Sequence, residues 1–143
     1  MHKIIILFFM LFASSVIAGE VNWAENYKSG IEQAVKEKKP VLFIISRDTC
    51  KYCVLLDNTT LKDEKVVQML TKNFVAIRSW TNEGDYIPQM IRQNTPGLPG
   101  IWFLYSDGTP MYQPVLGYMD NKNLLHALEV VKKEFDKNSK GKK

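Results

Sequence analysis

The sequence predicts a single α/β domain, built on a mixed central sheet with helices on both faces. The chain has 143 residues, enough for one domain with a substantial core. Its apolar residues alternate between helical spacing and short continuous runs, in the order helix, strand, helix, strand, helix, strand, strand, helix. A crossover helix makes the first two strands parallel, and a tight turn makes the last two antiparallel.

The first half of the domain contains one buried strand between helices. Helical spacing of aromatic and aliphatic residues predicts an amphipathic helix over 23–38. The run 41–45 is continuously apolar and mostly β-branched, which is typical of a strand buried on both faces. A helix is expected from about 49, with an interruption near 58–60 and a second helical piece over 63–72.

The second half contains the remaining strands and two helices. Residues 74–79 predict a strand and residues 86–93 a short helix. Residues 101–105 predict another strand, which the Asp-Gly turn connects to a partner strand over 111–116. A final helix is expected from an N-cap at Asp120 to about 136.

The two ends of the chain are expected to lie outside this domain, which then spans 19–136. Residues 1–18 combine a basic end, an apolar run and small residues before a cleavage site predicted after Ala18, the pattern of a secretory signal. The apolar run is shorter than the ~20 residues that a membrane-spanning helix needs. The protein is therefore expected in the periplasm or otherwise secreted, with no membrane contact once the signal is removed.

The formal net charge of +4 is concentrated near the C-terminus. Six lysines follow position 131, and the segment 137–143, rich in Lys, Ser and Gly, is expected to be a disordered tail. The folded part therefore has no basic face, and nucleic acid is not an expected partner.

Cys50 and Cys53 are the two cysteines of the chain, and they lie where the strand over 41–45 leads into a helix. The positive end of a helix favours the thiolate form of Cys50, and Cys53, one turn further on, can close a disulfide with it. This arrangement predicts thiol–disulfide exchange in which Cys50 forms a mixed disulfide and Cys53 resolves it. Lys51 and Tyr52, between the cysteines, are expected to contact the substrate.

Other uses of the cysteine pair are weaker. A structural zinc site needs four ligands, and Cys50, Cys53 and His126 supply too few in a monomer. An inert disulfide in a binding module remains an alternative, although a bridge across two residues restrains the unfolded chain little. A second alternative is a module in which the two thiolates hold a soft ion such as Cu(I). No cofactor is required, and no metal site is predicted.

The sequence resembles the thioredoxin superfamily, and in particular exported thioredoxin-like proteins of the kind represented by the C-terminal domain of the disulfide reductase DsbD. The resemblance rests on the C-x-x-C motif and four flanking segments: 39–43, 61–67, 73–75 and 97–99. It implies a thioredoxin-like fold, a cis peptide bond before Pro99 beside the cysteines, and a Leu98 backbone that pairs with a bound substrate segment. It also implies that the partners are protein thiols or disulfides and a redox partner protein.

Two departures from the family affect the expected mechanism. Thioredoxins carry a buried acid six positions before the first cysteine, where this chain has Ile44. The residue before the first cysteine is usually Trp in thioredoxins and is Thr49 here, so Thr49-Cys50-x-Tyr52-Cys53 resembles periplasmic disulfide isomerases of the DsbC kind. The sequence thus predicts a reductase or isomerase type, and leaves open the direction of exchange, the oligomeric state and the group that deprotonates Cys53.

Overall fold

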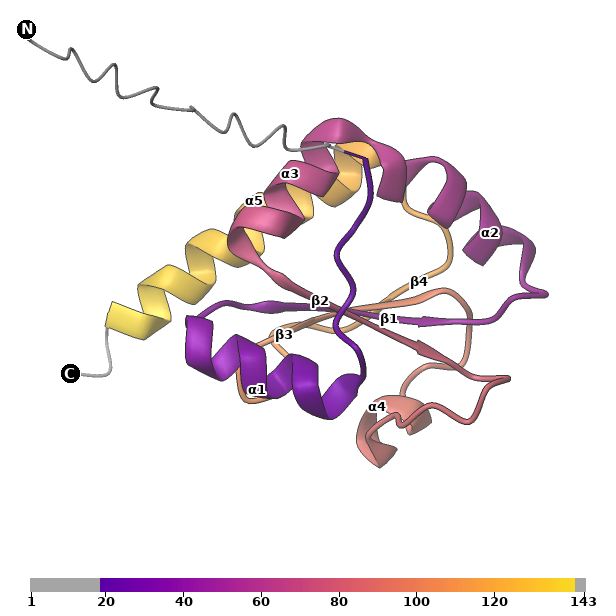
Figure 1. Cartoon of the computed structure of the whole chain (residues 1–143), viewed down its shortest axis with the longest axis horizontal. Helices are drawn as coiled ribbons and strands as arrows, with labels where there is room; N and C mark the ends of the chain where they lie inside the picture. The colour runs from indigo at the N-terminus through magenta and orange to yellow at the C-terminus, as the bar shows by residue number, and fades with distance from the viewer. Residues whose placement is uncertain (1–18, 141–143) are drawn as a thin grey trace, which may run out of the picture.

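The computed structural model describes residues 19–140, and the expected signal at 1–18 lies outside them. The predicted α/β architecture is confirmed: a mixed four-stranded sheet has the strand order β2-β1-β3-β4 (Figure 1). The first two strands in the chain run parallel, and β3 runs antiparallel to both β1 and β4. The strands are β1 (Val41–Ser46), β2 (Val75–Trp80), β3 (Gly100–Leu104) and β4 (Val115–Leu116).

Helices cover both faces of the sheet, as the sequence predicts (Figure 1). On one face lie α1 (Tyr27–Glu37) and the short α4 (Gln89–Gln93), which contribute Ala34 and Ile91 to one hydrophobic core. The other face is covered by α2 (Lys51–Asn58), the 3₁₀ turn η1 (Thr60–Lys62), α3 (Glu64–Asn73) and α5 (Asn121–Lys140).

Strand β1 is central, and all of its residues are buried. Because side chains alternate across a strand, Leu42 and Ile44 enter the core beneath α2, α3 and α5, whereas Phe43 and Ile45 enter the core beneath α1 and α4. Two cores and two neighbouring strands therefore fix the C-terminal end of β1, from which the cysteine loop begins.

The first helix begins later than the predicted start at 23. Asn26 caps it, with its side-chain oxygen accepting a hydrogen bond from the Ser29 N–H at 2.9 Å, so helical structure begins at Tyr27. Trp23 instead forms a parallel bridge to Ala76, beside β2. The aromatic spacing that suggests a longer helix thus includes one residue that belongs to the sheet edge.

The predicted strand over 111–116 is mostly irregular. Only Val115–Leu116 forms β4, and an isolated bridge joins Leu104 to Pro110. Pro110 and Pro114 have no N–H to donate, so a continuous ladder through this segment is interrupted.

The short helix α4 also differs from its predicted bounds because of a proline. It begins at Gln89 rather than at 86, since Pro88 occupies the N-cap position.

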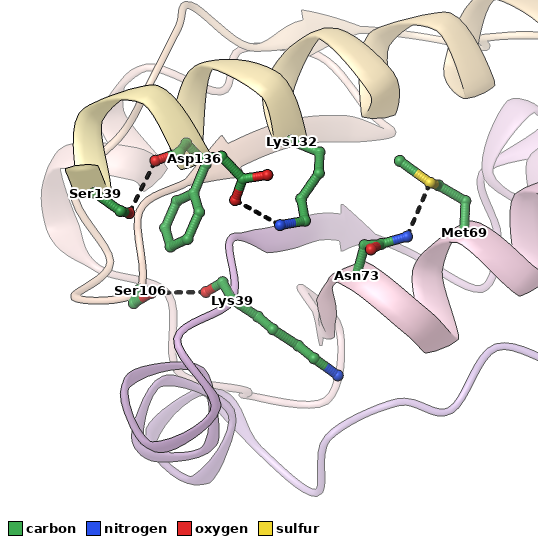
Figure 2. Close-up of polar contacts among 8 residues, drawn as sticks. Lys39, Met69, Asn73, Ser106, Lys132, Asp136 and Ser139 are labelled. Atoms are coloured by element: carbon green, nitrogen blue, oxygen red, sulfur yellow. Dashed lines mark hydrogen bonds and ion pairs between the residues drawn. The ribbon is translucent and has the colours of Figure 1, made fainter.

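The last helix is longer than the predicted end at 136 and continues through Lys140. Its C-terminal turns are held by the Lys132–Asp136 ion pair at 2.6 Å and by the Ser139 hydroxyl, which donates to the Phe135 carbonyl at 2.9 Å (Figure 2). Asn138 adds a bond from its side-chain amide to the Tyr105 hydroxyl at 2.9 Å. Residues 137–140, expected in the tail, are therefore part of the helix.

Among the described residues, none of the helices combines the length and the apolar character needed to cross a bilayer.

Candidate active site

The cysteine pair lies at the N-terminus of α2, where the chain leaves the C-terminal end of β1. Cys50 is the N-cap residue, and its Sγ accepts a hydrogen bond from the Cys53 N–H at 3.3 Å. Cys50 is partly exposed, whereas Cys53 is buried with 1% of its surface exposed. The geometry presents one sulfur to solvent and holds the second behind it, one turn into the helix.

The loop before β3 lies at the same end of the sheet. Ile45 near the end of β1 is paired with Gly100 at the start of β3, so the residues just before Gly100 approach the cysteine loop. The Leu98–Pro99 peptide bond is cis, and the Pro99 carbonyl accepts a hydrogen bond from the Gly117 N–H at 2.8 Å. Within residues 19–140, the backbone N–H and C=O of Leu98 make no hydrogen bond.

Lys51 and Tyr52 lie in the first turn of α2 and are both exposed. Tyr52, two positions after Cys50, is 54% exposed. The sequence-predicted residues from the motif and from the 98–99 loop therefore lie at the same end of the sheet.

Ser46, the last residue of β1, is a neighbour of Cys53 that sequence reasoning missed. Burial raises the pKa of the Cys53 thiol above its ordinary value of 9.0, and hydrogen bonds from the Ser46 side chain and the Arg47 backbone oppose that rise. Ser46 is itself buried, with 2% exposed. The sequence does contain a signal for this contact. Side chains alternate across a strand, so Ser46 lies on the same face as Ile44, two positions earlier.

A Ser46→Ala substitution is expected to raise the pKa of Cys53 further, because the thiolate loses a hydrogen-bond donor. The titration is best read from thiolate absorbance in a Cys50→Ser background, where Cys53 is the one remaining thiol. Ser79→Ala is the matched control, since Ser79 is equally buried but donates to the Tyr86 carbonyl. A Cys53 pKa that stays the same after the Ser46→Ala substitution would contradict this role for the hydroxyl.

A stacked arginine joins α2 to the edge strand β2. The guanidinium carbon of Arg78 lies 4.2 Å from the centre of the Trp23 ring and 4.6 Å from that of Trp80. Its Nη1 donates to Asp57 Oδ1 on α2 at 2.7 Å. Burial is the largest influence on both partners: it raises the pKa of the Asp57 carboxyl and lowers that of the Arg78 guanidinium. The cost of burying the two charged groups therefore offsets part of the attraction between them.

An Arg78→Lys substitution is expected to lower the free energy of unfolding by about 1–2 kcal/mol, because an ammonium keeps the charge but loses the planar stacking on both rings. Urea titration of the purified variant measures this change. Arg92→Lys, the same substitution at an exposed position on α4, is expected to change stability by less than about 0.5 kcal/mol. Similar losses in the two variants would show that the stacked geometry contributes nothing.

Within the described part of the chain, no group of three or more His, Cys, Asp or Glu side chains is arranged to hold a metal ion. His126 is exposed on α5. Two cysteines at a helix N-terminus, directly after the central strand of a mixed sheet, define the class of thioredoxin-fold proteins that carry a C-x-x-C pair.

Comparison with known families agrees with this class. A family model described as a thioredoxin-like domain matches residues 27–132. The chain therefore belongs to the thioredoxin-like domain family.

Individual relatives are distant in sequence. Anterior gradient protein 3 of Mus musculus is 25% identical over 127 residues, covering 81% of this chain and 76% of that protein. The C-terminal domain of Neisseria meningitidis DsbD in its oxidised form is 25% identical, with a TM-score of 0.55 over 72% of this chain and 90% of that domain. A thioredoxin from Thermus thermophilus has a TM-score of 0.65 at 20% identity, over 78% of this chain and 87% of that chain, and shows the shared fold.

Proposed function

We propose that the protein is an exported thiol–disulfide oxidoreductase that exchanges disulfides with protein substrates, as a reductase or isomerase. The observation that carries the proposal is the geometry of the pair: Cys50 is partly exposed at the N-cap of α2, and buried Cys53 donates its N–H to the Cys50 sulfur at 3.3 Å. The thiolate is the reactive form of a cysteine in exchange, and an exposed sulfur is accessible to a substrate disulfide.

The reaction proceeds in two exchange steps. The Cys50 thiolate attacks one sulfur of a substrate disulfide, the substrate S–S bond breaks, and the first substrate thiol leaves and takes up a proton. The Cys53 thiol then loses its proton and attacks Cys50 Sγ, which releases the second substrate thiol and leaves a Cys50–Cys53 disulfide. Two electrons pass from the pair to the substrate, and a dithiol on a redox partner protein returns them.

The substrate is expected to lie across the surface between exposed Tyr52 and half-buried Leu98, which precedes the buried Pro99. The Leu98 backbone N–H and C=O make no hydrogen bond within the described residues, so both groups are available to an extended substrate segment. Pro99 and Lys51 flank this position, the latter as an exposed cation in the first turn of α2. Export follows from the basic, apolar and small-residue pattern of residues 1–18.

The second step depends on a buried thiol. Since burial raises the pKa of Cys53, resolution is expected to accelerate as pH rises toward and above 9.0. The raised pKa of Cys53 also makes the reduced protein lose folding stability as the pH rises toward and above 9.0. The folded state holds the Cys53 proton to higher pH than the unfolded chain, so the stabilisation present below 9.0 is lost as pH rises through the folded-state pKa.

The proposal is tested by the turnover of a protein disulfide, such as insulin, with an excess of a small dithiol as reductant. The wild-type protein is expected to accelerate reduction, and Cys50→Ser to lower the rate by at least about a thousandfold, because a hydroxyl does not replace the attacking thiolate. Thr71→Ser, an exposed change on α3, is the control for general effects of substitution. Equal activity of the wild type and Cys50→Ser would contradict the proposal.

A further inference from the structure

A small cationic cavity lies beside the candidate active site, between the loop that precedes α2 and the loop that precedes β3. Its volume is about 280 Å³, below the usual range of roughly 300–1,000 Å³ for sites that bind drug-sized ligands. The cavity is therefore of a size to take a single side chain. Its lining residues are Ile45, Arg47, Thr81, Ile87, Arg92, Thr95, Pro96 and Leu98.

The two sides of this cavity belong to the chain segments that lead to Cys50 and to Pro99. The Arg47 carbonyl accepts a hydrogen bond from the Cys50 N–H at 3.2 Å, so the position of Arg47 is tied to that of the first cysteine. On the other side, Leu98 immediately precedes Pro99 and contributes to the cavity wall. The cavity is therefore lined by residues that lie next to Cys50 and Pro99 in the folded chain.

The charge that lines the cavity is positive and comes from two exposed residues. Two of the lining residues are arginines, and none is acidic. The ion pairs found among residues 19–140 use Lys39, Arg78 and Lys132 as their cations, so neither Arg47 nor Arg92 has an acidic partner within 4.0 Å. The acidic residues of the neighbouring loops, Asp48, Glu83 and Asp85, do not line the cavity, and Asp85 accepts a hydrogen bond from the Trp80 N–H.

The other residues that line the cavity are uncharged, so they do not compete with the arginines for an anion. The Arg47 Nε donates to Thr81 Oγ1 at 3.0 Å, which directs the rest of the guanidinium away from that contact. The Thr95 hydroxyl is already engaged, donating to the Ile91 carbonyl at 2.6 Å and accepting from Trp102 Nε1 at 3.0 Å. The arginine N–H groups are thus the charged donors that the cavity offers to an anion.

We infer that this cavity binds the carboxylate of an acidic side chain next to the reactive cysteine of a protein substrate. The inference rests on the proposed exchange function and adds a substrate class to it: disulfides flanked by Asp or Glu. An arginine pair suits a carboxylate because each guanidinium offers a planar set of donors. The apolar surfaces of Ile45, Ile87 and Leu98 fit the methylene groups of the same side chain.

The test uses two peptides, each with one cysteine blocked as a mixed disulfide with mercaptoethanol, that differ only in Glu or Gln beside the cysteine. The rate of each peptide with the reduced protein is divided by its rate with a free dithiol, which corrects for the intrinsic reactivity of its disulfide. The corrected rate is expected to be about 3–10-fold higher for the Glu peptide than for the Gln peptide. Arg92→Gln and Arg47→Gln are each expected to lower that ratio toward one, through a slower reaction with the Glu peptide. Lys36→Gln, which removes an exposed charge from the last turn of α1, is expected to keep the wild-type ratio.

A non-reactive pair of peptides, with Ser in place of Cys, separates the two proposals. Binding of the Glu peptide, followed by NMR shifts of residues 92–98, is expected to weaken in Arg92→Gln. Arginine-dependent binding without any exchange would support the cavity and refute the proposed function. Exchange that is equally fast for Glu and Gln peptides, or a Glu preference that survives both arginine substitutions, would overturn the inference and leave the exchange function standing.

Discussion

Replacing Cys53 with serine will leave the protein covalently attached to its substrates through Cys50. The first exchange step needs only the exposed sulfur at the N-cap of α2, whereas release needs the buried sulfur behind it. Without the resolving thiol, the mixed disulfide persists until an external thiol reduces it. Non-reducing electrophoresis of Cys53→Ser, expressed as the full-length chain, is expected to show higher-mass adducts that disappear on reduction.

The double variant Cys50→Ser/Cys53→Ser is the control for adducts that arise without either thiol, and Cys50→Ser alone tests the order of the steps. Because the remaining Cys53 has 1% of its surface exposed, the Cys50→Ser variant is expected to capture few substrates or none. Equal capture by Cys50→Ser and Cys53→Ser would reverse the proposed roles of the two cysteines. Absence of adducts from Cys53→Ser in its native compartment would argue for an inert pair.

A Leu56→Ala substitution is expected to lower the free energy of unfolding by about 2–5 kcal/mol. Leu56 lies on the inner face of α2, is 1% exposed and belongs to the core that also contains Leu42 and Ile44. Removing its side chain leaves a cavity beneath the helix that carries both cysteines. Chemical denaturation of the reduced and oxidised forms measures the loss in each.

The neighbouring leucine offers a matched control on the same helix. Leu55 is 39% exposed, so Leu55→Ala removes the same atoms from α2 with much less loss of packing, and is expected to cost less than about 1 kcal/mol. If the two variants lost stability equally, Leu56 would not be the residue that anchors α2 to the sheet.

The sequence predicts the parts of the fold that follow from hydrophobic pattern. The continuous apolar run of β1 is typical of a central strand buried on both faces, and the structure confirms this prediction. The C-x-x-C motif at the next helix start and the alternation of helices and strands predict the class of fold. These features depend on local periodicity, which one sequence is sufficient to reveal.

Other features depend on tertiary contacts that periodicity does not encode. Trp23 has the spacing of a helix residue, but a bridge to Ala76 places it at the sheet edge, where it stacks on Arg78. The contact of Ser46 with Cys53 becomes visible only when the strand and the helix are brought together. Arg47 and Arg92 are far apart in the chain and line one cavity because the ends of β1 and α4 meet beside the 98–99 loop.

The reduction potential of the Cys50–Cys53 couple tests the central claim most directly. It is measured by equilibrating the protein with glutathione buffers of defined ratio and quantifying the free thiols. A redox-active pair is expected to exchange with glutathione and to have a potential above about −300 mV. A potential below about −300 mV, with no exchange against glutathione, would identify a structural disulfide and contradict the account.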